Sequence, residues 1–209
     1  YGADVQMFHP GLDGSKVRKE LNLEDKFLVL YTGALGQAND IYTILKAASL
    51  LKAENKIQFV LFGDGKERPK LQETARKLGL QNLLFAGVRP KHQIPSIIAA
   101  SDVCLAILQD VPMFRTTYPN KVFDYMAAGK PTVLVIDGVI RQVIEESQGG
   151  VYVPPGDEHN LAQTILSLST RPVQLESMGK NARIYLETHL DREKMLEKTR
   201  ALFLKMGSQ

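Results

Sequence analysis

Six short apolar runs alternate with helical patterns along most of this chain, and this alternation constrains the fold more than any other feature. The runs lack the strict apolar–polar alternation of strands with one wet face, which indicates strands buried on both faces. The predicted strands cover residues 27–31, 57–62, 83–85, 103–107, 131–136 and 151–153, and the predicted helices cover 41–52, 67–78, 94–100, 121–128 and 140–147. Because a helix separates most successive strands, we expect an α/β fold, a Rossmann-like parallel sheet covered by helices on both faces.

The last third of the chain is predicted to be helical. After Val153, a Pro-Pro-Gly turn ends the alternation, and apolar residues recur at helical spacing from Leu161 to Leu168 and again from Met178 to Leu186. Residues 192–206 predict one more amphipathic helix, in which acidic and basic residues are mixed. This mixture favours a solvated face over a basic, membrane-binding one.

Composition excludes several classes of function. The 209 residues are 44% apolar and 23% charged, and 26 basic against 23 acidic residues leave a net charge of +3, which does not indicate general nucleic-acid binding. No apolar run approaches the roughly 18 to 20 residues that span a bilayer, and no leader pattern is visible, so we expect a cytoplasmic chain. The single Cys104 lies in an apolar run and is expected to be a small buried side chain. The four histidines lack metal-ligand spacing, so no metal cofactor is expected.

Residues 118–136 are the strongest candidate for a ligand site, because they read as a polar loop, a short helix, a Gly-Lys-Pro stop and an apolar strand. On a helix over 121–128, Lys121 and Asp124 share one stripe with Ala128. Open parallel sheets bind ligands at the carboxyl ends of their strands, and a helix start there suits phosphate. Taken alone, Lys121 and Asp124 would favour an ordinary surface ion pair, since such pairs are frequent on helices, and the flanking signature favours the site.

The same segment carries a resemblance to a known family. Met126-Ala-Ala-Gly-Lys-Pro131 resembles the Glu-Ala-Met-Ala-x-Gly-x-Pro signature of retaining glycosyltransferases of family four. Those enzymes have two Rossmann-like halves (the GT-B fold), and the signature belongs to the C-terminal, donor-binding half. Further stretches resemble the family in the family's order: Tyr1-Gly-Ala-Asp-Val-Gln-Met-Phe-His-Pro10 after the hinge, Tyr31-Thr-Gly-Ala-Leu-Gly36, Phe59-Val-Leu-Phe-Gly-Asp-Gly65, and Phe85-Ala-Gly-Val88 with residues 94–103.

The resemblance implies roles for residues of the signature segment. Asp124 falls at the second Glu of the family's paired-Glu motif, which holds the ribose of the nucleotide sugar. The first Glu corresponds to Thr116, which carries no charge. A branch of bacterial polysaccharide transferases has Pro-x-Lys-x-x-Glu-Tyr-Met-Ala at this place, matched here from Pro119 to Ala127 with Asp for Glu. Thr116, Lys121 and Asp124 are therefore the candidate catalytic residues, with Lys121 on the diphosphate and Thr116 near the transferred sugar.

The glycine loop after the first strand departs from the family. Gly33, Ala34 and Gly36 can bring backbone close to a diphosphate, as glycine-rich turns do, or form only the turn into the next helix. The family usually places an Arg and a Lys in or just after this loop, and residues 34–40 supply neither. We expect Lys121 to provide the missing charge, and Lys66 or Arg115 are less favoured substitutes.

Flanking residues complete the predicted donor site. The hydroxyl of Thr117 can bond phosphate or sugar oxygens and Tyr118 can pack on a ring, although residues 115–118 could also be an ordinary polar loop. Val88, Arg89 and Ile94 are base-pocket candidates by resemblance, and apolar residues at such a place are otherwise core. Asp64 and Asp102 are expected to be turn and strand-entry residues.

The resemblance implies that residues 1–209 are the C-terminal nucleotide-sugar-binding domain of a larger protein. We divide them into a hinge-proximal segment (1–25), a sheet core (26–155) and C-terminal helices (156–209). The substrate of this domain would be a nucleotide sugar, preferably a UDP-sugar, used without a metal in surface polysaccharide or glycolipid synthesis. The acceptor domain would lie on a missing N-terminal half, which would bring a lipid-linked acceptor at the inner membrane. The isolated fragment would then bind donor but turn over little.

Two alternatives remain open. A nucleotide-sugar 2-epimerase shares the two-half architecture but needs carboxylates and histidines for proton abstraction near the sugar, and Thr116 at the place of a Glu argues against it. A non-catalytic binding module of the same fold is favoured by the missing cations of the glycine loop.

Overall fold

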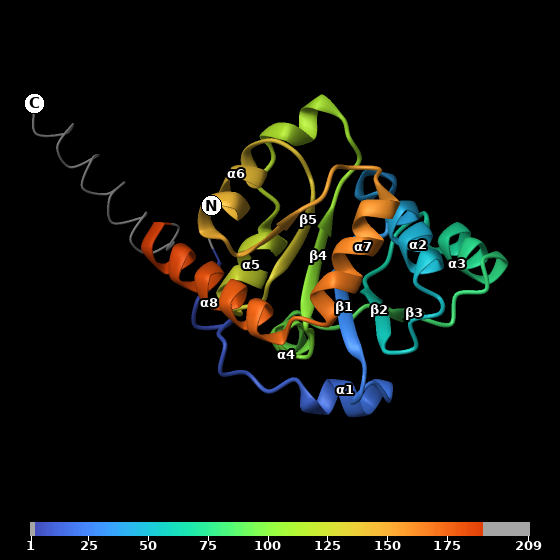
Figure 1. Cartoon of the computed structure of the whole chain (residues 1–209), viewed down its shortest axis with the longest axis horizontal. Helices are drawn as coiled ribbons and strands as arrows, with labels where there is room; N and C mark the ends of the chain where they lie inside the picture. Colours follow the sequence, from blue (N-terminus) through green and yellow to red (C-terminus); the bar gives the residue numbers. More distant parts are fainter. Residues whose placement is uncertain (1–2, 190–209) are drawn as a thin grey trace, which may run out of the picture.

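The computed structural model describes residues 3–189, in which six strands form one parallel sheet (Figure 1). The strands are β1 (Phe27–Thr32), β2 (Ile57–Phe62), β3 (Leu83–Gly87), β4 (Val103–Ile107), β5 (Thr132–Val135) and β6 (Gly150–Tyr152). Their order across the sheet is β3-β2-β1-β4-β5-β6, and every pairing is parallel. The predicted strands are confirmed, with ends that differ by at most two residues.

Helices cover both faces of this sheet. They are α1 (Ser15–Leu21), α2 (Ile41–Leu50), α3 (Arg68–Lys77), α4 (Ile94–Ala99), α5 (Asn120–Ala127), α6 (Val139–Ser147), α7 (Glu158–Ser169) and α8 (Pro172–His189). Three short 3-10 helices lie between them: η1 (Gln37–Asn39), η2 (Lys91–Gln93) and η3 (Pro112–Thr116). The predicted helix over residues 192–206 lies outside the described residues.

The core consists of two apolar clusters, one on each face. Val29 and Tyr31 of β1 pack in the cluster that includes side chains of α2, α3 and α7. Leu28 and Leu30 belong to the other cluster, with side chains of α4, α5, α6 and α8. Successive side chains of a strand point to opposite faces, so a strand buried on both faces must be apolar throughout. This is the predicted doubly covered α/β sheet.

Helix α1 is the element that the sequence pattern missed. It is short, highly charged and buries none of its own residues, so it shows no apolar periodicity. Its Arg18 holds it against the sheet, donating through Nε to the carbonyl of Ala100 at 2.7 Å and through Nη2 to Asp102 at 2.7 Å. Asp102 also accepts from the backbone N–H of Leu28, which makes it a strand-entry residue as expected.

The strand order reverses between β1 and β4, which pair directly with each other. Crossovers from β1 lead outward through β2 to β3, whereas those from β4 lead the other way through β5 to β6. The loops that leave the carboxyl ends of β1 and β4 therefore diverge, and the space between them is where open α/β sheets bind ligands. Residues 33–36 follow β1 at this point, and the loop that leads to α5 follows β4.

Candidate functional site

The ammonium of Lys121 is buried and has no hydrogen-bond partner among residues 3–189. It stands 4.2 Å from the centroid of the Tyr31 ring, at the end of β1. Burial lowers the pKa of Lys121 from its ordinary 10.5 to about 8. Because a buried charge is costly unless it is paired, this unpaired ammonium marks a place for an anion.

Gly33 is the residue that leaves room for this ammonium. Its φ is +147°, and a Cβ there would lie 2.5 Å from Nζ of Lys121 and 3.1 Å from the hydroxyl of Tyr31. Behind it, a Cβ on Gly63 would come within 1.8 Å of the carbonyl oxygen of Gly33. The turns after β1 and β2 therefore touch through their backbones, and glycine is required at both positions.

The rest of the glycine loop is fixed by backbone hydrogen bonds. Leu35 is fully buried, its N–H donates to the carbonyl of Asp64 at 2.8 Å, and its carbonyl accepts from the N–H of Glu67 at 3.1 Å. The hydroxyl of Tyr31 donates to the carbonyl of Ala34 at 2.9 Å. By contrast, a Cβ on Gly36 would meet nothing within 4 Å, so that glycine has no steric requirement.

Of the three cations considered for the glycine loop, Lys121 is the one whose ammonium reaches Gly33. Arg115 instead forms an exposed ion pair with Asp110 at 3.1 Å. Lys66 is exposed in the turn after β2. The geometry supports the choice of Lys121 over either substitute.

Asp124 lies one helical turn beyond Lys121 and is partly buried. Burial is the main cause that raises its pKa from 3.8 to about 6, the charge of Lys91 on η2 opposes this rise, and Asp4 from the N-terminal segment adds to it. The carboxyl group therefore faces residues from two other parts of the chain. A partly buried carboxyl group with a raised pKa is a candidate for a functional residue.

Tyr125 fixes the helix that carries both residues, a role that the sequence analysis did not assign. Its hydroxyl is fully buried, accepts from the N–H of Thr32 at 3.2 Å and shares a hydrogen bond of 2.8 Å with the hydroxyl of Thr32. This contact ties α5 to the carboxyl end of β1. A tyrosine in an otherwise apolar helix face is the available signal, because a buried hydroxyl needs a partner.

The loop between β4 and α5 contains Thr116, Thr117 and Tyr118. The hydroxyls of Thr116 and Thr117 donate to the carbonyl of Met113 at 3.2 and 3.4 Å, so their oxygens remain available as acceptors. Tyr118 stacks on Phe123, with ring centroids 6.2 Å apart. Its ring thus packs against the protein's own core, and the expected packing on a ligand ring is not supported by this contact.

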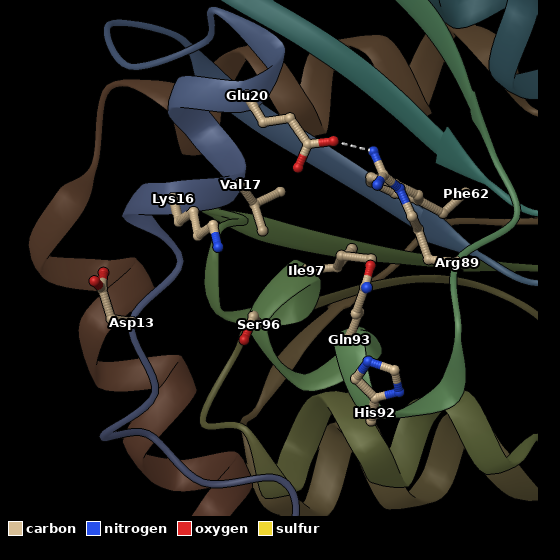
Figure 2. Close-up of a pocket in the computed structure, with 10 residues that line it drawn as sticks. All are labelled: Asp13, Lys16, Val17, Glu20, Phe62, Arg89, His92, Gln93, Ser96 and Ile97. Atoms are coloured by element: carbon tan, nitrogen blue, oxygen red, sulfur yellow. Dashed lines mark hydrogen bonds and ion pairs between the residues drawn. The ribbon is translucent and has the colours of Figure 1, made fainter.

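The base-pocket candidates separate into two groups. Val88, just after β3, is 67% exposed, and Ile94, the first residue of α4, is partly buried. Arg89 lines a pocket of about 470 Å³ between α1 and α4, where it pairs with Glu20 (Figure 2). Its guanidinium thus has a protein partner in that pocket.

Cys104 and Asp64 have the structural roles that were expected from the sequence. Cys104 is a free, fully buried thiol whose pKa burial raises to about 12, which agrees with a core role. Asp64 accepts from the N–H of Gly65 within its turn, as expected. Within residues 3–189, no cluster of His, Cys, Asp and Glu side chains could hold a metal ion. No helix in that range is both long and apolar enough to cross a bilayer.

Sequence comparison identifies relatives over most of the chain. The family model described as "Glycosyl transferases group 1" matches residues 14–185. The putative colanic acid biosynthesis glycosyl transferase WcaI of Escherichia coli is 27% identical over 188 residues, which cover 88% of this chain and 45% of WcaI. Alpha-D-kanosaminyltransferase of Streptomyces kanamyceticus is 26% identical over 170 residues, covering 80% of this chain and 43% of that protein. The chain thus spans less than half the length of these curated relatives.

Solved structures share the fold. HepE of Anabaena, crystallised in complex with UDP and glucose, superposes with a TM-score of 0.84 at 21% identity, covering 97% of this chain and 55% of HepE. The C-terminal domain of LpcC, a glycosyl transferase group 1 family protein of Francisella tularensis, superposes with a TM-score of 0.75 at 17% identity. That match covers 91% of this chain and 100% of the LpcC domain.

Proposed function

Since this chain belongs to the glycosyl transferases group 1 family, we propose that it is the nucleotide-sugar donor-binding domain of a retaining glycosyltransferase with two domains. The observation that carries the proposal is the buried ammonium of Lys121, which has no hydrogen-bond partner among the described residues and borders the space that Gly33 leaves open. The acceptor domain would be an N-terminal half, since the chain spans less than half of WcaI and of the kanosaminyltransferase. Residues 1–25 would follow the hinge, residues 26–155 would form the sheet core, and residues 156–209 would form the C-terminal helices.

The diphosphate of the donor would lie between Lys121 and the turn formed by Gly33, Ala34 and Gly36. Backbone N–H groups of this turn and of the first turn of α5 would add hydrogen bonds to the phosphate oxygens. When the bond from the sugar to the diphosphate breaks, negative charge develops on the leaving oxygen, and a buried cation stabilises it better than an exposed one. In this proposal the protein's own cation provides this stabilisation, so no metal cofactor is required.

Other residues of the site would contact the ribose, the sugar and the base of the donor. Asp124 would accept hydrogen bonds from the ribose hydroxyls, because its carboxyl group lies one turn from Lys121 on the same helix. Thr116 and Thr117 would offer their hydroxyl oxygens to the sugar and the distal phosphate. Val88 and Ile94 would line the base, and Tyr118 would support the loop from behind by its stacking on Phe123.

The preferred donor is a UDP-sugar and the preferred product is a surface polysaccharide or glycolipid. Two of the similar proteins support this preference, since HepE was crystallised with UDP and WcaI is a putative transferase of colanic acid biosynthesis. A lipid-linked acceptor would reach the active site through the N-terminal half, and the full protein would work in the cytoplasm at the inner membrane surface. The domain alone would bind donor with little turnover.

One observation favours a second candidate, a non-catalytic binding module of the same fold. Residues 34–40 of the glycine loop carry no cation, and the position of a sugar-binding Glu is held by Thr116. Such a module would retain the nucleotide contacts of Lys121 and Asp124 without completing the transfer. It differs from the first candidate in activity once the acceptor domain is supplied.

The test is a nitrogen–proton NMR titration of the 209-residue chain with UDP, GDP and ADP. We expect one nucleotide to shift the amide signals of Gly33, Val88 and residues 121–124. Lys121→Met should remove the response to the diphosphate, whereas the matched variant Lys66→Met, which changes an exposed lysine of the neighbouring turn, should keep it. No shifts with any of the three nucleotides at millimolar concentration would contradict donor binding by this domain.

A further inference from the structure

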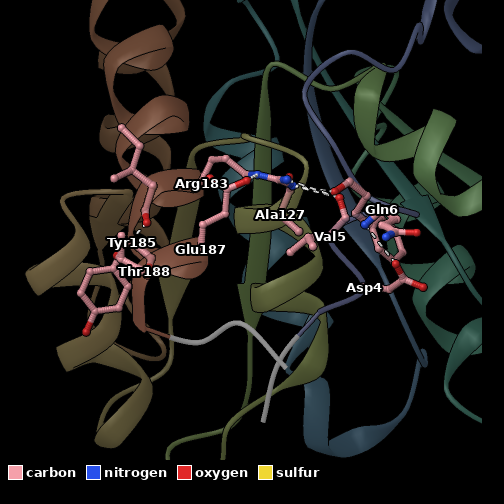
Figure 3. A network of polar contacts seen from close by, with 10 residues as sticks. Asp4, Val5, Gln6, Ala127, Arg183, Tyr185, Glu187 and Thr188 are labelled. Carbon is pink, nitrogen blue, oxygen red and sulfur yellow. Dashed lines mark hydrogen bonds and ion pairs between the residues drawn. The ribbon is translucent and has the colours of Figure 1, made fainter. Parts of the chain in front are cut away.

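Arg183 joins three segments of the chain that are far apart in sequence (Figure 3). It lies on α8, and its side chain is only 16% exposed. Its guanidinium donates to the carbonyl of Ala127 at 2.5 Å, to that of Phe8 at 2.8 Å and to that of Val5 at 3.3 Å. Nε donates to Glu187 on the same helix at 2.6 Å. A planar guanidinium with five donors suits such a junction, whereas an ammonium of lysine does not reproduce its fork.

The hydrogen bond to the carbonyl of Ala127 replaces a backbone donor that the signature segment lacks. In a continuing helix the carbonyl of Ala127 would accept from the backbone N–H four residues later. That residue is Pro131, which has no N–H. Arg183 supplies the missing donor and places a positive charge at the C-terminal end of α5, where the helix dipole favours it.

Close backbone packing makes this junction rigid. A Cβ on Gly179 of α8 would come within 2.1 Å of the carbonyl oxygen of Gly129, just after α5. Gly129 has a φ of +65°, and a Cβ there would meet Pro10 at 2.9 Å. Gly129, just after α5, therefore packs against the backbone of Gly179 on α8 and against the ring of Pro10 in the N-terminal segment (residues 3–10).

The N-terminal segment affects the candidate site through the charge of Asp4. The carboxylate of Asp4 accepts from the N–H groups of Gln6 and Met7 at 3.0 and 2.9 Å, which shapes a local turn. The same carboxylate is one of the two charges from other segments that act on Asp124, the second being Lys91. Where residues 3–10 lie thus determines part of the electrostatic environment of Asp124.

We propose that Arg183 is a positioning residue of the donor site, which holds α5 and residues 3–10 in one fixed arrangement so that Lys121 and Asp124 meet the nucleotide together. The inference rests on the proposed function where it concerns the nucleotide. Its part that concerns the surroundings of Asp124 does not depend on the proposed function, because it rests on the contacts of Arg183 with residues 3–10 and on the charge of Asp4 in that segment. An arginine with a purely structural role would stabilise the fold without affecting nucleotide binding or the surroundings of Asp124.

The test compares Arg183→Met, Arg183→Lys and the control Lys180→Met, which removes an exposed ion pair with Glu176 from the same helix. Two quantities are measured on folded protein: the Kd for UDP, and the midpoint of the pH titration of the Asp124 carboxyl carbon by NMR. We expect Arg183→Met to weaken UDP about tenfold, equal to about 1.4 kcal/mol. We expect the midpoint of Asp124 to fall, because the segment that brings Asp4 is released and the burial of Asp124 decreases.

Arg183→Lys should give intermediate values for both quantities, and Lys180→Met should match the wild type. If Arg183→Met does not fold, Arg183→Lys provides the same comparison. Unchanged UDP affinity together with an unchanged Asp124 midpoint, in a protein that merely melts earlier, would overturn the proposal. If the wild type binds none of UDP, GDP and ADP while the midpoint still falls in the two Arg183 variants, the donor function is wrong and the positioning of Asp124 by Arg183 stands.

Discussion

Replacing Lys121 by methionine should make the protein more stable and a weaker binder of nucleotide. Methionine keeps the length of the lysine stem and its packing near Tyr31 but removes the charge. The pKa of Lys121 falls from 10.5 to about 8 in the folded chain because of burial. At about 1.4 kcal/mol per pKa unit, keeping the ammonium charged in this place costs the folded state about 3 kcal/mol.

Part of that cost is recovered by the contact of the ammonium with the Tyr31 ring, at 4.2 Å from its centroid, since a cation over an aromatic face is worth about 1 kcal/mol. The net gain of Lys121→Met at pH 7 is therefore about 2 kcal/mol. For a chain of this size, this gain corresponds to a rise in Tm of roughly 4 to 8 °C. The Kd for UDP should increase by about tenfold or more, because a charge-assisted hydrogen bond is lost.

The stability gained by Lys121→Met should decrease as the pH rises. The folded chain has the lower pKa, so between about pH 8 and pH 10.5 the unfolded chain binds more protons, and the stability of the wild type rises with pH. The advantage of Lys121→Met is then complete below pH 8 and disappears toward pH 10.5. Thermal unfolding at pH 7 and pH 10 measures it. A variant that is less stable than the wild type at pH 7, or whose advantage is the same at both pH values, would refute an unpaired buried charge.

Three further predictions concern the same edge of the sheet. First, between pH 7 and pH 9 the Kd of the wild type for UDP should increase about tenfold while that for uridine stays constant, because Lys121, with its pKa of about 8, becomes mostly deprotonated. Calorimetric titration with both ligands measures the two Kd values. A Kd for UDP that does not change with pH would show that Lys121 does not bind the phosphates. Second, Asp124→Asn should weaken uridine and UDP by the same factor of about ten, since both carry the ribose and hydrogen bonds to a charged group are worth about 1.5 kcal/mol or more. The same substitution should stabilise the free protein at pH 7, because the raised pKa of Asp124 makes its charged form costly above about pH 6, and losses that differ between the two ligands would exclude the ribose assignment. Third, Gly33→Ala should lower stability by about 1–3 kcal/mol through backbone strain and weaken UDP by displacing Lys121. Gly36→Ala, where a Cβ meets nothing in the free protein, should leave stability unchanged; equal losses of stability for the two substitutions in melting assays would contradict the steric argument.

The strands were predictable because burial on both faces requires a continuous run of apolar residues, and such a run can be recognised in the sequence alone. Helix α1 was not predictable in this way. Its stability depends on Arg18, whose partners Ala100 and Asp102 lie more than 80 residues away in the sequence. A local pattern contains no trace of such partners, and the charged surface of α1 therefore resembles a loop.

The candidate site shows the same division. Helical spacing was enough to bring Lys121 and Asp124 to one face of α5. That the ammonium lacks a partner and borders Gly33 follows from the adjacency of β1 and β4, strands that are 70 residues or more apart in the sequence. Arg183 reads in the sequence as one more cation of an amphipathic helix, and only packing shows that it is buried. The ion pair of Arg89 with Glu20 could not be predicted, because Glu20 lies on the unpredicted α1.

Leu35, the buried residue inside the glycine loop, has a consequence for the kinetics of binding. Its side chain and its two backbone hydrogen bonds to the turn after β2 hold the loop in shape before any ligand arrives. A loop that is already ordered loses little conformational entropy on association, so less of the interaction free energy is consumed in shaping the site. Nucleotide association with this loop should accordingly follow a single concentration-dependent phase in stopped-flow measurements, without a slower rearrangement after the encounter.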